Sequence, residues 1–326
     1  MSLLEKNSSS AQLAQGLGVH SLDHFSLCVP DLREAQRFYS SFGLDVREES
    51  SGLALYTRDH PHRWGLLLEG KTKRLLYLSF GVFAQDVDSL KRHIEACHET
   101  LLDPPGELGS ARGARGDGLW LRDPDGLWLE LRVADKSSPN TKSIPEFSSS
   151  PPGQPGAPKR SQAPSVRPSR LGHCLMFTRS VPTTVSFYER VLGLRLSDQA
   201  GEDIAFLHGI HGSDHHLVAF ARAEGPGLHH CSWDVRSLND LGLGAEQMAR
   251  QGYSAGWGLG RHVLGSNYFH YVRDPWGSYC EYSCDMDYIP AGEPWQARNH
   301  DGEDAFYVWG PKPPADWTHN YEADLR

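Results

Sequence analysis

The sequence predicts an α+β fold in which one domain occurs twice. LDHFSLCVPDLREAQRFYSSFGLDV, from Leu22, matches LGHCLMFTRSVPTTVSFYERVLGLRL, from Leu171. A second matched pair closes the copies, RDPDGLWLEL from Arg122 and RDPWGSYCEY from Arg273. A repeat of this length indicates a duplicated domain rather than a solenoid unit. Predicted helices are few and punctuate runs of strands, which favours α+β with mostly antiparallel pairing.

Each copy opens with a strand and an amphipathic helix. A strand histidine, His24 or His173, precedes a Phe-Tyr pair on that helix, and the helix ends at a Gly-Leu turn. Glycine suits the C-terminal cap of a helix, so we expect helices that stop at Gly43 and Gly193. In the second copy the pattern predicts strands near 171–178, 203–208, 215–221, 228–235, 268–273 and 278–284, and helices at 181–192 and 237–251.

Four segments follow from length and composition. With 326 residues, two domains are expected, and we place them at 16–134 and 171–285. Residues 135–170 are rich in Ser, Pro and Gly and predict a linker that is dispensable for chemistry. In 286–326, prolines are interleaved with aromatic residues that include Trp295, Phe306, Tyr307, Trp309 and Trp317. This segment is either a structural strap on the second domain or a lid over its site.

Composition also restricts partners and location. The net charge of −9, with both signs mixed, argues against nucleic acid or an anionic membrane as partner. No apolar run approaches membrane-spanning length and the first residues lack a signal-peptide pattern, so we expect a cytoplasmic protein. The six cysteines show no disulfide framework. Cys174, Cys231 and Cys280 each adjoin a candidate ligand, and strand alternation points them to the opposite face.

Three residues of the second copy predict one metal site. His173, His230 and Glu281 lie on three separate predicted strands. Two imidazoles and one carboxylate bind a divalent metal on one side and leave the other side open, as in non-haem Fe(II) oxygenases. The cofactor is therefore expected to be Fe(II), with Mn(II) as the alternative for the same ligand set.

The choice of His230 over its neighbour His229 rests on strand alternation. His230 shares a face with Ser232, whereas His229 shares the other with Trp233. A small serine suits a crowded site, and a bulky tryptophan suits packing against helices. We therefore expect replacement of His229 by alanine to leave bound iron largely intact.

The first copy lacks a complete ligand set. His24 and Glu130 occupy the outer ligand positions, but Tyr77 stands where the middle histidine is needed. A neutral phenol is a poor ligand for a divalent metal. We expect a structural copy without metal, whose histidine and glutamate are solvated or internally paired.

These motifs resemble the two-domain extradiol (meta-cleaving) ring-cleavage dioxygenases of the vicinal oxygen chelate superfamily. G-H-x-x-x-x, H-H-x-x-W-x-V, G-L-G-R-H and D-P-x-G-x-x-x-E occur in the family's order. The resemblance implies duplicated domains of paired βαβββ modules around an open cup. It implies that the Fe(II) ligands are His173, His230 and Glu281; that His215 moves protons beside bound O2, with His216 as the alternative; and that His262 and Tyr271 contact the catecholic oxygens.

The implied reaction is insertion of O2 into a catecholic ring beside its vicinal diol, giving a 2-hydroxymuconic semialdehyde-type product. The expected partners are a catechol, O2 and further copies of the chain in a homo-oligomer. Arg298 is a candidate contact for an anionic ring substituent. The competing hypotheses are a glyoxalase-like isomerase or other metal-dependent enzyme of this superfamily, and a metal-free binding protein of the same fold.

Overall fold

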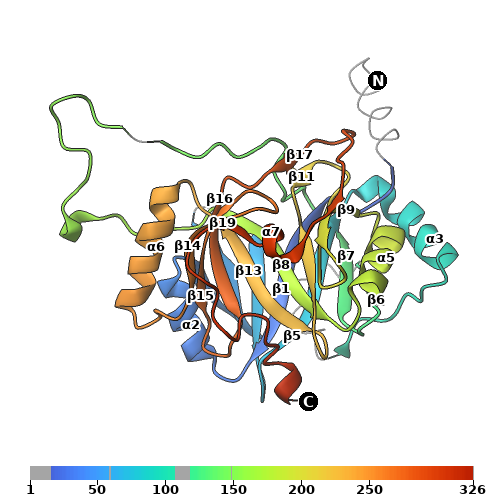
Figure 1. Ribbon diagram of the computed structural model, residues 1–326. Coiled ribbons are helices and arrows are strands. Elements are labelled where there is room, and N and C mark those ends of the chain that lie inside the picture. Colours follow the sequence, from blue (N-terminus) through green and yellow to red (C-terminus); the bar gives the residue numbers. More distant parts are fainter. Residues whose placement is uncertain (1–15, 59, 107–117, 148, 326) are drawn as a thin grey trace, which may run out of the picture.

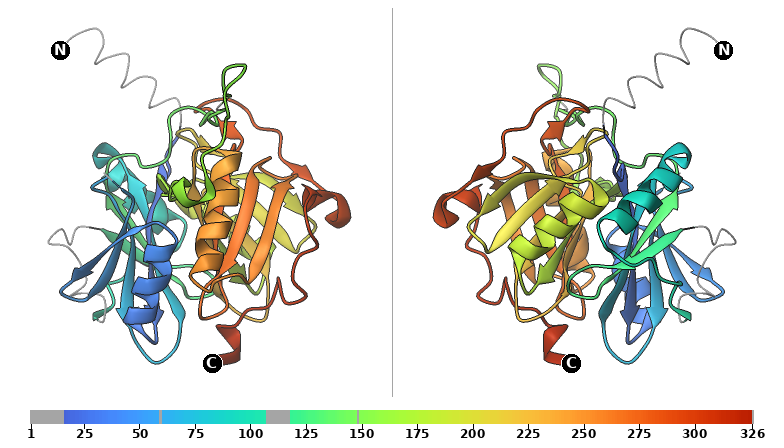
Figure 2. Two further views of the ribbon diagram at one scale, coloured as in Figure 1. Left: turned by 90° about the vertical axis from the view of Figure 1, so that its left-hand side faces the viewer. Right: turned by 90° about the vertical axis from the view of Figure 1, so that its right-hand side faces the viewer.

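A computed structural model describes residues 16–58, 60–106, 118–147 and 149–325 (Figure 1). Two mixed sheets dominate it, one from each half of the chain. The first has the strand order β2-β3-β4-β1-β5-β7-β6, and the second the order β18-β9-β10-β12-β8-β13-β16-β15-β14-β19. The two domains stand side by side (Figure 2).

The first domain consists of two modules. The first module is β1 (Ser21–Val29), α2 (Leu32–Ser41), β2 (Asp45–Glu49), β3 (Gly52–Tyr56) and β4 (Arg63–Glu69). The second is β5 (Arg74–Val82), η1 (Ala84–Asp86), α3 (Val87–Ala96), β6 (Leu119–Arg122) and β7 (Trp128–Val133). An isolated bridge between Leu102 and Trp120 stands where its remaining strand would lie.

The second domain repeats this plan with fuller strands. Its third module is β8 (Arg170–Thr178), α5 (Val181–Leu192), β9 (Arg195–Ala200), β10 (Ile204–His208) and β12 (Val218–Arg222). The fourth is β13 (Gly227–Asp234), α6 (Leu238–Arg250), β14 (Gly256–His262), β15 (Tyr268–Arg273) and β16 (Tyr279–Cys284). The predicted α+β fold of duplicated, paired βαβββ modules is confirmed.

Strand pairing is mostly antiparallel, as predicted, with a parallel pair inside each module. The modules meet through antiparallel β1–β5 and β8–β13, while β1–β4, β5–β7, β8–β12 and β13–β16 are parallel. Strands β9 and β14 were not predicted. In β14, glycines hide the strand pattern, and Gly256 is needed because a Cβ there would lie 2.0 Å from the Tyr271 carbonyl oxygen.

The helix ends follow the sequence signals. The Asp31 side chain accepts hydrogen bonds from the first-turn N–H groups of α2, and Ser180 does the same for α5. Gly193 ends α5 with a φ of 73°, a left-handed conformation in which glycine lacks the steric penalty of other residues. Helices α2 and α5 therefore begin directly after their capping residues, and α5 ends at the glycine that the sequence indicated.

The two domains share one hydrophobic core. The rings of Phe42 and Tyr282 stack 3.8 Å apart, and the Tyr282 hydroxyl donates to the Phe42 carbonyl. Cys174, Cys231 and Cys280 are buried in the same core, so they point away from the ligands beside them, as strand alternation predicted.

The segment between the domains is anchored at both ends. Ser138 is buried against β1, and Val166 lies in the shared core with its N–H donating to Gln247. Lys142 pairs with Asp285 at 3.0 Å. The predicted linker is therefore packed against both domains at its ends, although its middle part, with η2 (Arg160–Gln162), projects outward (Figure 1).

The C-terminal segment joins the two edges of the large sheet. It contributes β17 (Tyr288–Ile289), paired with β11 (Ser213–Asp214), and then β18 (Arg298–Asn299), paired with β9. After α7 (Gly302–Ala305), β19 (Tyr307–Trp309) pairs with β14 at the opposite edge, and η3 (Ala323–Leu325) follows. We call residues 286–325 the strap. Among the described residues, no helix has the length and apolar character required to cross a membrane.

Candidate metal centre

Three neighbouring strands bring the predicted ligands together. His173 lies on β8, His230 on β13 and Glu281 on β16, and Ser232 pairs with both His173 and Glu281 across the sheet. The Nε2 atoms of the two histidines are 3.1 Å apart. Glu281 Oε2 lies 3.3 Å from the His173 nitrogen and 3.7 Å from the His230 nitrogen. All three side chains are buried.

The electrostatics of this cluster fit a cation. Glu281 is fully buried, and its Oε1 accepts a hydrogen bond from Asn267 at 3.1 Å. Its Oε2 is buried without a hydrogen-bond partner while facing two imidazole nitrogens. Burial raises the pKa of Glu281, but the proximity of the imidazoles of His173 and His262 lowers it below its usual value overall. Among the described residues, this is the one group with the spacing of a metal site.

A neighbouring histidine orients one ligand. His229 Nε2 lies 2.8 Å from the Trp317 carbonyl oxygen, which can only accept, so this nitrogen carries the proton. His229 Nδ1 is then an acceptor, and His230 Nδ1, 2.7 Å away, donates to it. This tautomer leaves the lone pair of His230 Nε2 directed at the cluster. His230 therefore faces the cluster, and His229 lies behind it as its hydrogen-bond partner.

His262 and Tyr271 border the same cluster. His262 Nδ1 donates to the Phe306 carbonyl at 2.9 Å, so its Nε2 accepts from the Tyr271 hydroxyl at 2.9 Å. That nitrogen is 3.9 Å from Glu281 Oε1. Burial, followed by the proximity of Glu281, raises the pKa of Tyr271 well above its ordinary value, so the phenol stays protonated. The structure therefore brings both residues to the cluster.

The structure places His216, not His215, at the cluster. The ring centroids of His216 and His173 are 4.0 Å apart, and His216 lines the cavity described below. His215 points away, bonds to Asp198 at 2.9 Å and packs against Trp295. Residues 215–217 lie between β11 and β12 and belong to neither strand, so strand alternation could not decide between the two histidines. Of the two histidines that the sequence left open, His216 is the one that lies beside the cluster.

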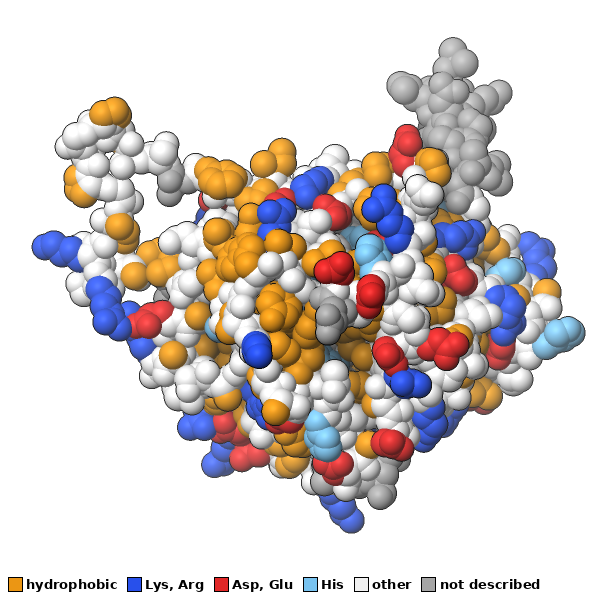
Figure 3. All heavy atoms as spheres, in the orientation of Figure 1, with side chains coloured by type: hydrophobic (Ala, Val, Ile, Leu, Met, Phe, Trp, Pro, Cys, Tyr) orange, Lys and Arg blue, Asp and Glu red, His pale blue; other side chains and the backbone are white. Residues whose placement is uncertain are grey.

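A cavity of about 590 Å³ opens beside the metal cluster. One wall is apolar and comes from β8, β10 and β12, including Leu175, Phe206 and Ala221. The strap supplies the opposite wall with Phe306 and Trp317 among others. Apolar side chains gather on this face of the molecule beside β14 and β19 (Figure 3). The cavity therefore combines a polar, metal-binding end with an apolar body, the usual composition of a small-molecule site.

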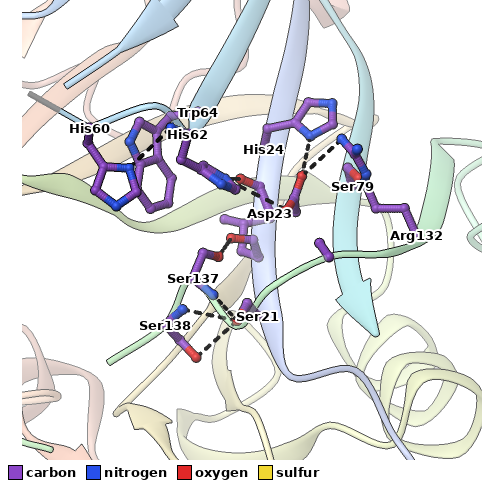
Figure 4. A network of polar contacts seen from close by, with 12 residues as sticks. Ser21, Asp23, His24, His60, His62, Trp64, Ser79, Arg132, Ser137 and Ser138 are labelled. Carbon is purple, nitrogen blue, oxygen red and sulfur yellow. Dashed lines mark hydrogen bonds and ion pairs between the residues drawn. The ribbon is translucent and has the colours of Figure 1, made fainter. Parts of the chain in front are cut away.

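The corresponding position in the first domain is occupied by its own side chains. His24 Nδ1 bonds to Asp23 at 2.7 Å, and His24 Nε2 lies 2.9 Å from the Tyr77 hydroxyl. Glu130 accepts from Ser79 at 2.7 Å. Figure 4 shows His24 and Arg132 turned toward Asp23. The expected internal pairing of this histidine and glutamate is confirmed.

Sequence reasoning missed Asn267 and the role of His229. Asn267 Nδ2 donates to Glu281 at 3.1 Å and to Ser283 at 2.9 Å. It lies in the turn between β14 and β15, in a GSNY stretch that reads as an ordinary loop. The adjacent histidine pair was visible, but the carbonyl of Trp317 that fixes its tautomer lies 88 residues away.

Comparison with known proteins agrees with this geometry. Residues 21–131 and 170–282 each match the Glyoxalase/Bleomycin resistance protein/Dioxygenase superfamily. Metapyrocatechase 2 of Cupriavidus necator is 47% identical over 305 residues, which cover 94% of this chain and 93% of that protein. An iron-dependent extradiol dioxygenase of Rhodococcus jostii is 29% identical over 153 residues, covering 43% of this chain and 50% of that one.

A solved structure shares the architecture. The Mn(II)-bound glyoxalase from Novosphingobium aromaticivorans superposes with a TM-score of 0.72 at 23% identity, covering 91% of this chain and 93% of that chain. Similarity at this level of identity concerns the fold alone, which glyoxalases and dioxygenases share. The two matched repeats and the extensive match to metapyrocatechase show that the chain belongs to the Glyoxalase/Bleomycin resistance protein/Dioxygenase superfamily, as a two-domain extradiol dioxygenase with the vicinal oxygen chelate fold.

Proposed function

We propose that this chain uses one Fe(II), bound by His173, His230 and Glu281, to cleave a catechol beside its vicinal diol with O2. The observation that carries the proposal is the buried, unpartnered Oε2 of Glu281. It converges with two imidazole nitrogens at the polar end of an apolar cavity. Both oxygen atoms of O2 enter the product, a 2-hydroxymuconic semialdehyde, so the reaction needs no separate reductant.

The ligand set supports iron. Two imidazoles and one carboxylate on one face are typical of non-haem Fe(II) oxygenases, and the Rhodococcus jostii relative is named as iron-dependent. The bound ion would provide adjacent positions for the diol and O2 and a path for electrons between them. Mn(II) is the alternative metal, because the same donor set accommodates both ions.

The surrounding side chains have separate tasks in this proposal. The Tyr271 hydroxyl, which donates to His262, accepts a hydrogen bond from a substrate hydroxyl group and so orients it. His216 lies against His173 at the edge of the cavity, where it accepts the proton of the second hydroxyl and later returns it. The strap excludes water from the reacting groups.

The body of the cavity supports a catechol with an apolar, uncharged substituent. Among the described lining residues outside the metal end, the charged ones are Asp203 and Arg222. These are exposed and pair with each other at 2.7 Å. Arg298 is exposed and is absent from the described lining, so the cavity gives no support to its contact with an anionic substituent. The volume of about 590 Å³ leaves room beyond one ring.

The decisive experiment is anaerobic loading with Fe(II), followed by addition of air and a panel of catechols. We expect a yellow product, one O2 consumed per catechol, and higher kcat/KM for alkyl- or aryl-substituted catechols than for carboxylated ones. Isomerisation of a glutathione hemithioacetal without O2 consumption would establish the glyoxalase-like alternative. Tight binding of catechols without turnover in the iron-loaded protein would establish a binding protein.

The assembly and location complete the proposal. Val308 and Trp309 are exposed on β19 at the edge of the large sheet, which supports a homo-oligomer. The absence of a disulfide among the cysteines of the described residues supports a reducing, cytoplasmic environment. Light scattering during size-exclusion chromatography tests the first expectation, and fractionation of the host cell tests the second.

A further inference from the structure

Lys73 belongs to the first domain, but its ammonium group is buried against the second. It precedes β5 and is 3% exposed. Its Nζ donates to Glu322 at 2.7 Å, to the Leu228 carbonyl at 3.4 Å and to the Ser278 hydroxyl. Three donors meet three acceptors, so the cation is fully satisfied. A buried ion pair is weak evidence for stability, because the cost of desolvating two charges offsets their attraction. Its effect is therefore better explained by the chain segments that it holds in place.

Glu322 connects the two domains at this point. One carboxylate oxygen accepts from Lys73 and from the Leu228 N–H at 3.0 Å, and the other accepts from the Leu75 N–H at 3.0 Å. Leu75 lies on β5 and Leu228 on β13. The pair therefore fixes both backbone polar groups of Leu228, two residues before the metal ligand His230.

The strap also influences His230, through the neighbouring residue His229. The Asn320 side chain donates to the Gly225 carbonyl at 2.7 Å, which anchors the strap to the chain before β13. The Trp317 carbonyl accepts from His229, which in turn orients His230. Since 317 and 322 are only five residues apart, the position of Glu322 helps determine the position of the Trp317 carbonyl.

We propose that Lys73 and Glu322 are positioning residues for the metal centre. The ion pair seats the end of the strap and holds residues 228–230, so that His230 presents Nε2 to the metal. The first domain, which lacks a metal cluster among its described residues, thereby contributes to metal binding in the second. The inference rests on the part of the proposed function that places a metal ion at His173, His230 and Glu281, but not on ring cleavage.

The test uses the full chain with Lys73→Met, Glu322→Gln and the double variant. Controls are Arg74→Met and Asp324→Asn, which remove the same charges at exposed neighbouring positions. Fe(II) affinity is measured by chelator competition, and seating of the strap by chymotrypsin cleavage of the folded protein within residues 317–321. We expect each single variant to bind Fe(II) about 10–100-fold more weakly. We also expect faster cleavage of both single variants. The double variant should bind Fe(II) as tightly as the weaker-binding single variant, because both substitutions remove the same interaction.

Contrary outcomes are distinct. Fe(II) affinity equal to the controls in both single variants would overturn the inference, as would additive losses in the double variant. If Lys73→Met does not fold, Glu322→Gln decides, since it preserves shape and removes only the charge. If the pair acts only on stability, the variants should unfold at a lower midpoint temperature but bind Fe(II) with unchanged affinity at temperatures at which they are folded. That result would also overturn the inference. Neither readout needs turnover, so failure of ring cleavage would leave this result standing.

Discussion

Exchange of His216 for glutamine tests the assignment of the acid–base residue. The His216 ring is 4.0 Å from that of His173 and faces the cavity, but it is not among the three ligands. Glutamine keeps a polar side chain of similar reach but cannot take up a proton near neutral pH. We expect bound iron and catechol affinity to be retained, and turnover to slow by about 10²–10⁴, the range for loss of a positioned acid–base group.

His215→Gln is the matched control. His215 bonds to Asp198, but that carboxylate also accepts from the Arg298 N–H at 2.9 Å and from His300 at 3.1 Å. Asp198 is therefore not left without partners. Because His215 Nδ1 also lies 3.1 Å from His216 Nδ1, the loss should be about 1–2 kcal/mol of stability, as for two hydrogen bonds. Turnover should stay close to that of the unaltered protein.

The assay is steady-state O2 consumption by each iron-loaded variant, with iron content and anaerobic catechol binding measured on the same samples. Slow turnover in His215→Gln together with normal turnover in His216→Gln would refute the geometric argument and restore the assignment made from the motif. Loss of iron in His216→Gln would show that His216 supports the ligands rather than moving a proton.

Four further predictions follow from the structure. His229→Phe should weaken Fe(II) binding about 10–100-fold, in contrast to the sequence-based expectation for this position, while His230→Ala should abolish it; chelator competition measures both. Elemental analysis should find one iron per chain, because Tyr77 bonds to His24 in the first domain. Burial lowers the pKa of His20 and His208 to about 4. The stability that the neutral imidazoles provide above pH 6.5 should therefore be lost as the pH falls toward 4. Urea unfolding midpoints measure this loss, which should be smaller in His208→Gln. Replacing 147–159 by a short flexible tether, with Lys142 and Val166 kept, should change the free energy of unfolding by about 1 kcal/mol or less. The iron content should equal that of the full chain, and a lower iron content would contradict the prediction that this segment is dispensable.

The sequence by itself determined the duplicated α+β plan and the three candidate ligands. These features depend on local patterns that occur once in each copy, such as a histidine on the first strand and a glutamate after the Asp-Pro-x-Gly turn. His230 could be preferred over His229 because side chains on a regular strand alternate between faces. Residues 227–234 do form strand β13, and His230 and Ser232 share its site face although the pairing with β8 shifts register beside His229.

Tertiary structure decided the points at which the chain is irregular or the partner is distant. His215 and His216 lie between two strands, where alternation gives no prediction. The tautomer of His230 depends on a carbonyl of the strap, and the seat of the strap depends on Lys73 in the other domain. Hydrogen bonds of this kind are made between groups brought together only by folding, and no local periodicity encodes them.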